Sequence, residues 1–333
     1  VKHAVMTNSG SSANLLMIAA LFERGDIQRG DEVIVPAVSW STTYFPLYQY
    51  GLKLVFVDVD EFGNIDPALV IKAITNRTRL IFAVNLLGFS ANLSELKHIA
   101  DQKQIHLIED NCESFGATHQ DKSCATWGVM GSLSFFFSHH ITTMEGGCVL
   151  TNDDELAEYL RPLRAHGWVR DSQTNLLWQK SGDDFRDSFQ FVLPGYCVRP
   201  LELSAAVGMV QLDKWPDQRQ GRLDNARRFL DATRDLDHIT TPEWRDGATW
   251  FGLPVLTESG TARDELIRRC RAEGIECRPM IAGNFLNQPV MRRIDHRVYG
   301  HLPRAERIDK TGVFFGNDAR DLSEQIDKLA KTL

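Results

Sequence analysis

The sequence predicts an α/β protein with a mostly parallel central sheet that helices cover on both faces. Strand-like runs that are nearly all apolar alternate with helical patterns through the first half of the chain, which is typical of sheets buried on both sides. The chain has 333 residues, enough for two cores. We therefore expect a large domain at 1–215 and a smaller α+β domain at 216–333.

The overall composition is that of an ordinary globular protein. Apolar residues make up 43% of the chain, charged residues 24%, and the net charge is −7. No block of lysines and arginines is present, so we expect no nucleic-acid partner. No apolar run reaches the roughly 20 residues of a membrane span, so we expect no membrane partner. The six cysteines form no cluster, which predicts a reduced, cytoplasmic protein without a metal site or an iron–sulfur cluster.

The turn and helix start at residues 8–22 predict an anion-binding site. A short apolar run leads into the small residues of 8–14, and a helical pattern follows at 15–22. A helix start of this kind directs free amide groups and hydroxyls toward one point, so Gly10, Ser11 and Ser12 are candidates for binding phosphate. Plain capping of the helix by serine is the alternative. No nucleotide-triphosphate or dinucleotide motif is present.

Further strands and helices follow in alternation. We expect strands at 32–36, 52–59, 80–85 and 105–110, and helices at 67–74 and 93–103. Crossovers in such a sheet are right-handed, so functional groups meet at the carboxyl ends of the strands. Trp40, Asn85, Asp110, His139 and His140 are therefore expected at one edge. Trp40 is either a stacking platform for a planar ring or a core residue.

Asp110 stands directly after an apolar strand. A buried carboxylate needs a cationic or hydrogen-bonding partner, and a pyridinium nitrogen would serve. Capping of the next helix is the competing interpretation.

The stretch 134–147 combines an apolar run with two adjacent histidines and a Gly-Gly turn. The run predicts a buried strand, and the glycines predict a turn after it. His139 and His140 at a strand end suit a site where a proton moves. The alternative is that both rings only pack.

The second half predicts fewer regular elements. We expect a helix at 153–163, a polar loop at 171–186, a helix at 201–212 and a second helix after Trp215. A strand at 249–256, a helix at 262–273 and an extended segment at 275–279 would form the α+β domain.

Taken together, these segments resemble the DegT/DnrJ/StrS group of sugar aminotransferases, which depend on pyridoxal phosphate (PLP) and have fold type I. The likeness is carried by 8–13, 36–40, 109–113, 134–147, 166–168 and 195–199. The resemblance implies a three-layer αβα large domain with a seven-stranded, mostly parallel sheet. It also implies several tens of residues before the phosphate loop, so we expect a segment of this kind to precede Val1.

One substitution distinguishes this chain from the family's aminotransferases. In those enzymes a lysine five residues after the serine of a Ser-Phe motif binds the cofactor covalently. Here the serine is Ser134, the fifth residue after it is His139, and no lysine lies between Lys122 and Lys180. The chain therefore resembles the family's deoxygenating branch, in which pyridoxamine phosphate (PMP) is not covalently held and His139 is the catalytic base.

The resemblance also implies a role for each site residue. The phosphate would lie against Gly10, Ser11, Ser12 and Ser134, and the ring would stack on Trp40. Asp110 would pair with the pyridine nitrogen and Glu113 would lie near the ring hydroxyl. Cys197 stands where the family usually has an asparagine that reaches the neighbouring subunit's cofactor. The substrate candidates by resemblance are Arg199, Arg278 and Asn284.

The deoxygenating branch has two styles. One acts on CDP-sugars with an iron–sulfur cluster, which the scattered cysteines disfavour. The other implies loss of the C3 oxygen from a nucleotide-linked 4-keto-6-deoxy sugar, with GDP favoured, in the synthesis of a lipopolysaccharide dideoxysugar such as colitose. It implies L-glutamate as amino donor and a homodimer with shared active sites. The alternatives are a sugar aminotransferase, a 3-dehydrase for CDP- or dTDP-sugars, and a non-catalytic member.

Overall fold

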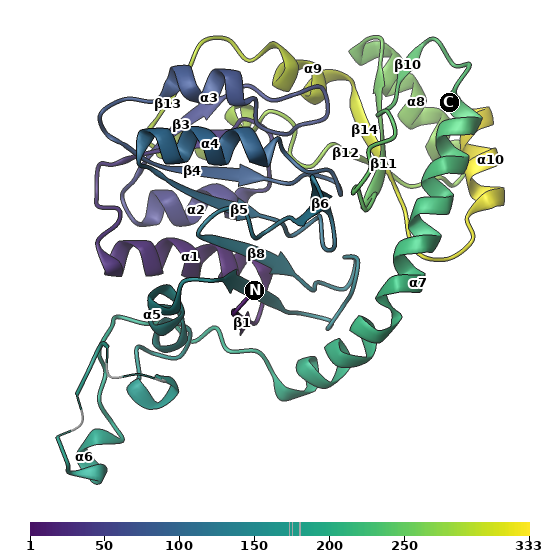
Figure 1. The fold of residues 1–333 in the computed structure, drawn as a ribbon. Helices are drawn as coiled ribbons and strands as arrows, with labels where there is room; N and C mark the ends of the chain where they lie inside the picture. Colours follow the sequence, from purple (N-terminus) through teal and green to yellow (C-terminus); the bar gives the residue numbers. More distant parts are fainter. Residues whose placement is uncertain (173, 175, 180) are drawn as a thin grey trace.

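The computed structural model describes residues 1–172, 174, 176–179 and 181–333 (Figure 1). Residues 173, 175 and 180 of the predicted loop lie outside the described residues. The described part of that loop includes the end of a 3₁₀ helix, η1 (Val169–Asp171), and a short helix, α6 (Asp184–Asp187).

A mostly parallel sheet of eight strands forms the centre of the large part of the molecule (Figure 1). Its order is β1-β9-β8-β5-β4-β2-β3-β13, and β9 alone runs antiparallel to its neighbours. The strands, in spatial order, are β1 (His3–Thr7), β9 (Gly147–Thr151), β8 (Met130–Ser134), β5 (His106–Asp110), β4 (Thr78–Val84), β2 (Glu32–Pro36), β3 (Lys53–Val57) and β13 (His296–Val298). The fold class is confirmed, but the sheet has eight strands rather than seven because β13 pairs with the edge strand β3.

Helices cover both faces of this sheet, as the apolar runs predict. In β2 the side chains of Val33 and Val35 face one core, and Ile34 faces the other. The first face carries helices α1 (Gly10–Arg24), α2 (Ser41–Gln49) and α5 (Asp154–Arg164), and the second carries α3 (Pro67–Ala73) and α4 (Leu93–Lys103). Successive side chains of a strand point to opposite faces of the sheet, so one strand contributes residues to two separate hydrophobic cores.

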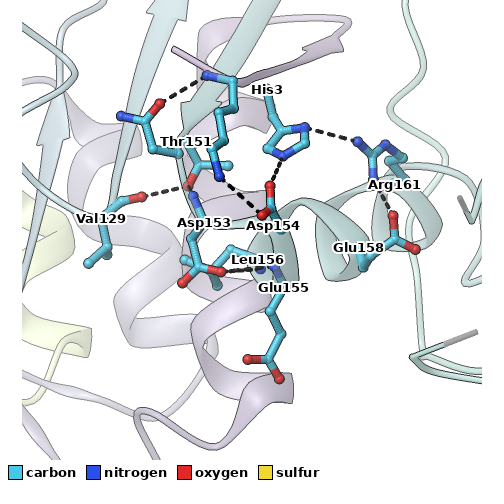
Figure 2. Close-up of polar contacts among 11 residues, drawn as sticks. His3, Val129, Thr151, Asp153, Asp154, Glu155, Leu156, Glu158 and Arg161 are labelled. Atoms are coloured by element: carbon cyan, nitrogen blue, oxygen red, sulfur yellow. Dashed lines mark hydrogen bonds and ion pairs between the residues drawn. The ribbon is translucent and has the colours of Figure 1, made fainter. Parts of the chain in front are cut away.

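Helix α5 and strand β1 are fastened to each other by polar contacts (Figure 2). Asp153 caps α5 by accepting hydrogen bonds from the amides of Glu155 and Leu156 at 2.9 and 3.0 Å. The ring of His3, on β1, lies 2.7 Å from the Asp154 carboxylate and 3.2 Å from the Arg161 guanidinium. These contacts anchor β1, which leads directly into the predicted phosphate loop.

Helix α7 (Glu202–Thr233) is one continuous helix where the sequence predicts two. Pro216 lies inside it, although proline removes one helical hydrogen bond and usually ends or kinks a helix. Packing keeps the helix intact, because Leu223, Ala226 and Phe229 on its second half are buried in the main core. Its first half extends away from the large sheet (Figure 1).

A second, antiparallel sheet forms the C-terminal part, with the order β10-β11-β14-β12. Its strands are β10 (Ile239–Thr240), β11 (Gly252–Thr257), β14 (Gly312–Gly316) and β12 (Cys277–Pro279). The helices of this part are α8 (Gly260–Ala272), α9 (Pro303–Thr311) and α10 (Ser323–Thr332), and two 3₁₀ helices are η2 (Phe285–Asn287) and η3 (Pro289–Arg293). A small hairpin joins β6 (Thr118–His119) and β7 (Lys122–Ser123). The division into domains at residue 215 stays a prediction.

Within the described residues, every helix is too short or too polar to cross a membrane. The six cysteines carry free thiols.

Candidate active site

A cavity of about 500 Å³ opens at the carboxyl edge of the large sheet. The structure brings together there, as lining residues, the candidates Gly10, Ser11, Trp40, Asp110, Glu113, Ser134, His139 and Arg278. They come from the start of α1, the start of α2, the ends of β5 and β8, and β12. The meeting of Trp40, Asp110 and His139 at one edge is what strand order requires.

Four candidates lie outside the lining of this cavity. The hydroxyl of Ser12 donates to Asn8 Oδ1 at 2.6 Å. Cys197 and Arg199 are exposed, 4.0 Å apart at Sγ and Nη2. Asn284 is 2% exposed, and its side chain is occupied by Glu306 and by the amide of Leu286.

The start of α1 forms a cradle with the end of β8. Ser9 caps the helix by accepting from the Ser12 amide, and Gly10 follows it. A β-carbon on Gly10 would come within 2.6 Å of Ser134 Cβ and 2.7 Å of Cys112 Sγ. Only glycine fits such a close approach. Helix-start amides beside two serine hydroxyls fit a phosphate group.

Asp110 is held by neutral donors at the base of the cavity. Its Oδ2 accepts hydrogen bonds from Asn14 Nδ2 at 2.7 Å and from Thr43 Oγ1 at 2.8 Å. Its Oδ1 accepts from the Cys112 amide at 3.2 Å. The carboxylate is thereby oriented at the cavity without a salt-bridge partner among the described side chains, which suits a cationic ring nitrogen.

Two acid–base groups facing the cavity have displaced pKa values of opposite sign. Burial, reinforced by the charge of Asp110, raises the pKa of Glu113 to about 7, although the Leu87 amide donates to Glu113 Oε2 at 3.1 Å and opposes the shift. Burial lowers the pKa of His139 to about 4. Groups displaced in this way suit different proton roles in one site.

The two histidines are not equivalent. Only His139 lines the cavity. His140 is buried behind it, with Nε2 3.3 Å from the Thr249 carbonyl and its ring against Trp215 and Phe251. Burial holds the pKa of His140 well below its usual value. His140 therefore packs, whereas His139 is available to a bound molecule.

Trp40 stands at the start of α2 with 58% of its side chain exposed, so it is not a core residue. It lines the cavity and offers a flat apolar surface to a planar ring. None of the described residues that line the cavity is a lysine.

Sequence reasoning missed four residues that shape the site: Asn14, Thr43, Arg222 and Phe251. Asn14 and Thr43 are polar positions within helices that are otherwise apolar toward the sheet, which was the available signal. Phe251 lines the cavity, Arg222 lies behind it and donates to the Phe251 carbonyl, and no local pattern marks either residue.

Comparison with known proteins assigns the chain to a family. The DegT/DnrJ/EryC1/StrS aminotransferase family matches residues 1–333, and the chain belongs to it. The chain is similar to GDP-4-keto-6-deoxy-D-mannose 3-dehydratase of Escherichia coli O55:H7, with 47% identity over 100% of this chain and 88% of that protein. The enzyme of the same name from Yersinia pseudotuberculosis is 48% identical, over 100% of this chain and 86% of that one.

Solved structures agree with this assignment. The E. coli GDP-4-keto-6-deoxy-D-mannose-3-dehydratase with bound hydrated PLP superposes with a TM-score of 0.96 and 46% identity, over 100% of this chain and 87% of that one. A mutant of GDP-4-keto-6-deoxymannose-3-dehydratase with bound GDP-perosamine gives a TM-score of 0.95 and 46% identity, over 99% of this chain and 88% of that one.

Proposed function

We propose that the chain is a PLP/PMP-dependent dehydratase that removes the C3 oxygen of GDP-4-keto-6-deoxy-D-mannose. The observation that carries this proposal is a half-buried histidine, His139, in a cavity whose described lining has no lysine; burial lowers the pKa of His139 to about 4. A lysine would hold the cofactor covalently through its primary amine, whereas the imidazole of a histidine has no such amine and can instead take or give a proton near neutral pH. The relatives named above carry this activity in their names.

The residues present fit the cofactor. Gly10, Ser11 and Ser134 would hold its phosphate, Trp40 would stack on its ring, and Asp110 would pair with its ring nitrogen. Bound there, the cofactor supplies an amine that condenses with the C4 ketone and a ring that accepts electrons.

Three residues would then manage protons and orientation. His139, neutral near pH 7, would remove a proton from the C4′ carbon of the cofactor. Loss of this proton would allow the C3 hydroxyl of the sugar to leave. Glu113 would donate a hydrogen bond to the ring hydroxyl while it is protonated. Arg278 is exposed at the mouth of the cavity, paired with Glu276 at 2.7 Å, and would contact the nucleotide sugar. L-glutamate would restore the amine.

We further propose a homodimer with shared active sites. At the start of α7 several apolar side chains are more than half exposed: Leu201, Leu203, Met209, Val210 and Leu212. Such a face is typical of an interface. Cys197 and Arg199 precede this face and, lying outside their own chain's cavity, would reach the cavity of the second copy.

Six free thiols suit a reducing compartment, so we propose a cytoplasmic location. Immunoblotting of cell fractions tests this proposal; recovery in the periplasmic fraction would contradict it.

An assay of product mass tests the reaction. The purified protein is incubated with PLP, L-glutamate and, separately, the GDP-, CDP- and dTDP-linked 4-keto-6-deoxy sugars. We expect a product one oxygen atom lighter from the GDP-sugar. An aminated sugar as the main product would instead identify an aminotransferase.

A further inference from the structure

The imidazole of His139 lies between two phenyl rings. Its centroid lies 5.8 Å from that of Phe136 and 5.2 Å from that of Phe251, with interplanar angles of 79° and 85°. Its Nδ1 is buried and has no hydrogen-bond partner of good geometry among the described residues, and a backbone contact with Ser134 opposes the fall in its pKa. A catalytic histidine is usually oriented by a hydrogen bond to its second nitrogen. Here two edge-to-face contacts also flank the ring and limit its rotation.

Phe136 belongs to the loop that carries His139 between β8 and β9 (residues 135–146), called the histidine loop below. Phe251 comes from the segment just before β11. The backbone of Phe251 is fixed on both sides. Its amide donates to the Leu87 carbonyl at 3.0 Å, and its carbonyl accepts from Arg222 Nη1 at 3.4 Å. The ring is therefore presented to His139 by two elements distant in sequence.

The residues before Phe251 form a strained, fully anchored turn. Trp250 is completely buried with a φ of 47°, a left-handed conformation that is rare for a bulky residue. The Thr249 amide donates to the Gly88 carbonyl, and Asn317 donates to the Trp250 carbonyl, both at 2.9 Å. A β-carbon on Gly88 would meet the Trp250 amide nitrogen at 2.5 Å. Strain of this kind persists where the surroundings enforce it, often at functional sites.

Arg222 joins this turn to α7. It is 5% exposed, and Nη1 donates to the carbonyls of Asn317 at 2.5 Å and of Phe251. Asn317 returns a hydrogen bond to the Arg222 carbonyl at 3.1 Å. A buried guanidinium that bonds mainly to backbone carbonyls serves to fix the chain.

We propose that Phe251 is a positioning residue that orients the imidazole of His139, and that Arg222 acts through Phe251 by holding its carbonyl. The base role of His139 rests on the proposed function, but the contact itself does not. Phe251 also shields His139 from water, so its removal alters both the freedom and the protonation of the ring.

The first test needs no cofactor. Phe251→Leu keeps an apolar side chain but removes the ring, and Phe229→Leu is the control because Phe229 is buried in the core on α7. Histidine-labelled, cofactor-free protein is titrated by NMR, and His139→Asn identifies the resonance. In the wild type we expect a pKa near 4. In Phe251→Leu it should rise, and the resonance should change in width.

The charges that face His139 must be the same in every variant compared. They are Asp110, Glu113 and Glu145 in the cavity, His140 behind it, and Arg222 on α7. Neither leucine substitution changes them. A shift confined to Phe251→Leu therefore reports the ring contact.

The second test uses turnover of the GDP-sugar. Phe251→Leu should lower kcat about 10- to 100-fold, the scale of a misplaced catalytic group, with little change in KM. Arg222→Met should reproduce the loss of kcat, and Arg222→Lys should restore part of it; the His139 titration is compared only between variants that keep the Arg222 charge, because that charge itself lowers the pKa of His139. If Arg222→Met does not fold, the leucine pair decides alone.

The proposal is overturned if Phe251→Leu leaves the His139 titration and kcat no more altered than Phe229→Leu does. Failure of the proposed function looks different: the wild type would deoxygenate no sugar, while the NMR titration would still report whether Phe251 controls His139.

Discussion

Asn14 donates a hydrogen bond of 2.7 Å to Oδ2 of Asp110, and the hydroxyl of Thr43 donates to the same oxygen at 2.8 Å. Asn14 lies on α1 and Thr43 on α2. The two helices that start at the cavity therefore both donate a hydrogen bond to the carboxylate of Asp110. The pair fixes the direction in which Asp110 faces the cavity. Through Asp110, it connects the starts of the two helices that carry the residues proposed to bind the phosphate and to stack on the ring.

Removal of these donors should weaken both fold and cofactor binding. Asn14→Ala or Thr43→Val leaves a buried carboxylate short of one donor, which should lower the free energy of unfolding by about 1–3 kcal/mol. We also expect weaker binding of PLP, measured by fluorescence titration. Thr233→Val is the control, because the hydroxyl of buried Thr233 donates to carbonyls of α7 itself. Unchanged PLP affinity in both site variants would contradict the assignment of Asp110.

Gly10→Ala should abolish binding of the cofactor phosphate. Its β-carbon would lie 2.6 Å from Ser134 Cβ, so the cradle must open. Gly316→Ala is a matched control, since a β-carbon there meets nothing within 4 Å. Equilibrium dialysis with PLP measures the loss. Equal affinity in the two variants would place the phosphate elsewhere.

Glu113→Gln should change how stability depends on pH. The folded-state pKa of Glu113 is raised from 4.5 to about 7. Its contribution to the free energy of unfolding is therefore lost as pH rises through that range. The folded-state pKa of His139 is lowered from 6.5 to about 4. The contribution of His139 to the free energy of unfolding is therefore lost as pH falls through that range. In the wild type, the pH dependences of stability that come from Glu113 and His139 have opposite signs and partly cancel. Without Glu113, the melting temperature should rise more steeply between about pH 4.5 and 6.5.

The control for this measurement is Glu258→Gln, which removes an exposed carboxyl group. It should leave the wild-type profile in place. If Glu113→Gln gave the same profile as the control, Glu113 would not be protonated in the folded protein near neutral pH.

Leu203→Glu should dissociate the proposed dimer. Leu203 is 72% exposed on the first half of α7, and a charge there would be buried at the interface without a partner. Ile71→Glu, on α3 and 40% exposed, is the control. Light scattering after size exclusion should give half the mass for the first variant only. A wild-type monomer would refute the shared site.

The sequence predicts this fold well where burial follows a simple period. The apolar runs at 32–36 and 105–110 are strands because both of their faces are covered, and this places Asp110 at the functional edge. Strand β13 could not be foreseen, since His296–Val298 is short and polar and pairs only because β3 leaves an edge open. The helix predicted at 201–212 and the one predicted after Trp215 are a single helix, α7, because packing keeps it continuous through Pro216.

The site divides in the same way. Gly10, Ser134 and His139 lie on local motifs and could be proposed from their neighbours in sequence. Phe251 and Arg222 could not, because their contribution depends on contacts between the C-terminal part and the histidine loop. No local pattern encodes such contacts.

Substitution of His139 tests the central claim most directly. Wild type, His139→Asn and His139→Lys are incubated in parallel with PLP, L-glutamate and GDP-4-keto-6-deoxy-D-mannose, and the sugar product is weighed by mass spectrometry. We predict a product one oxygen atom lighter from the wild type alone, with PLP still bound by His139→Asn and covalently attached in His139→Lys. Undiminished loss of oxygen in His139→Asn would contradict the account.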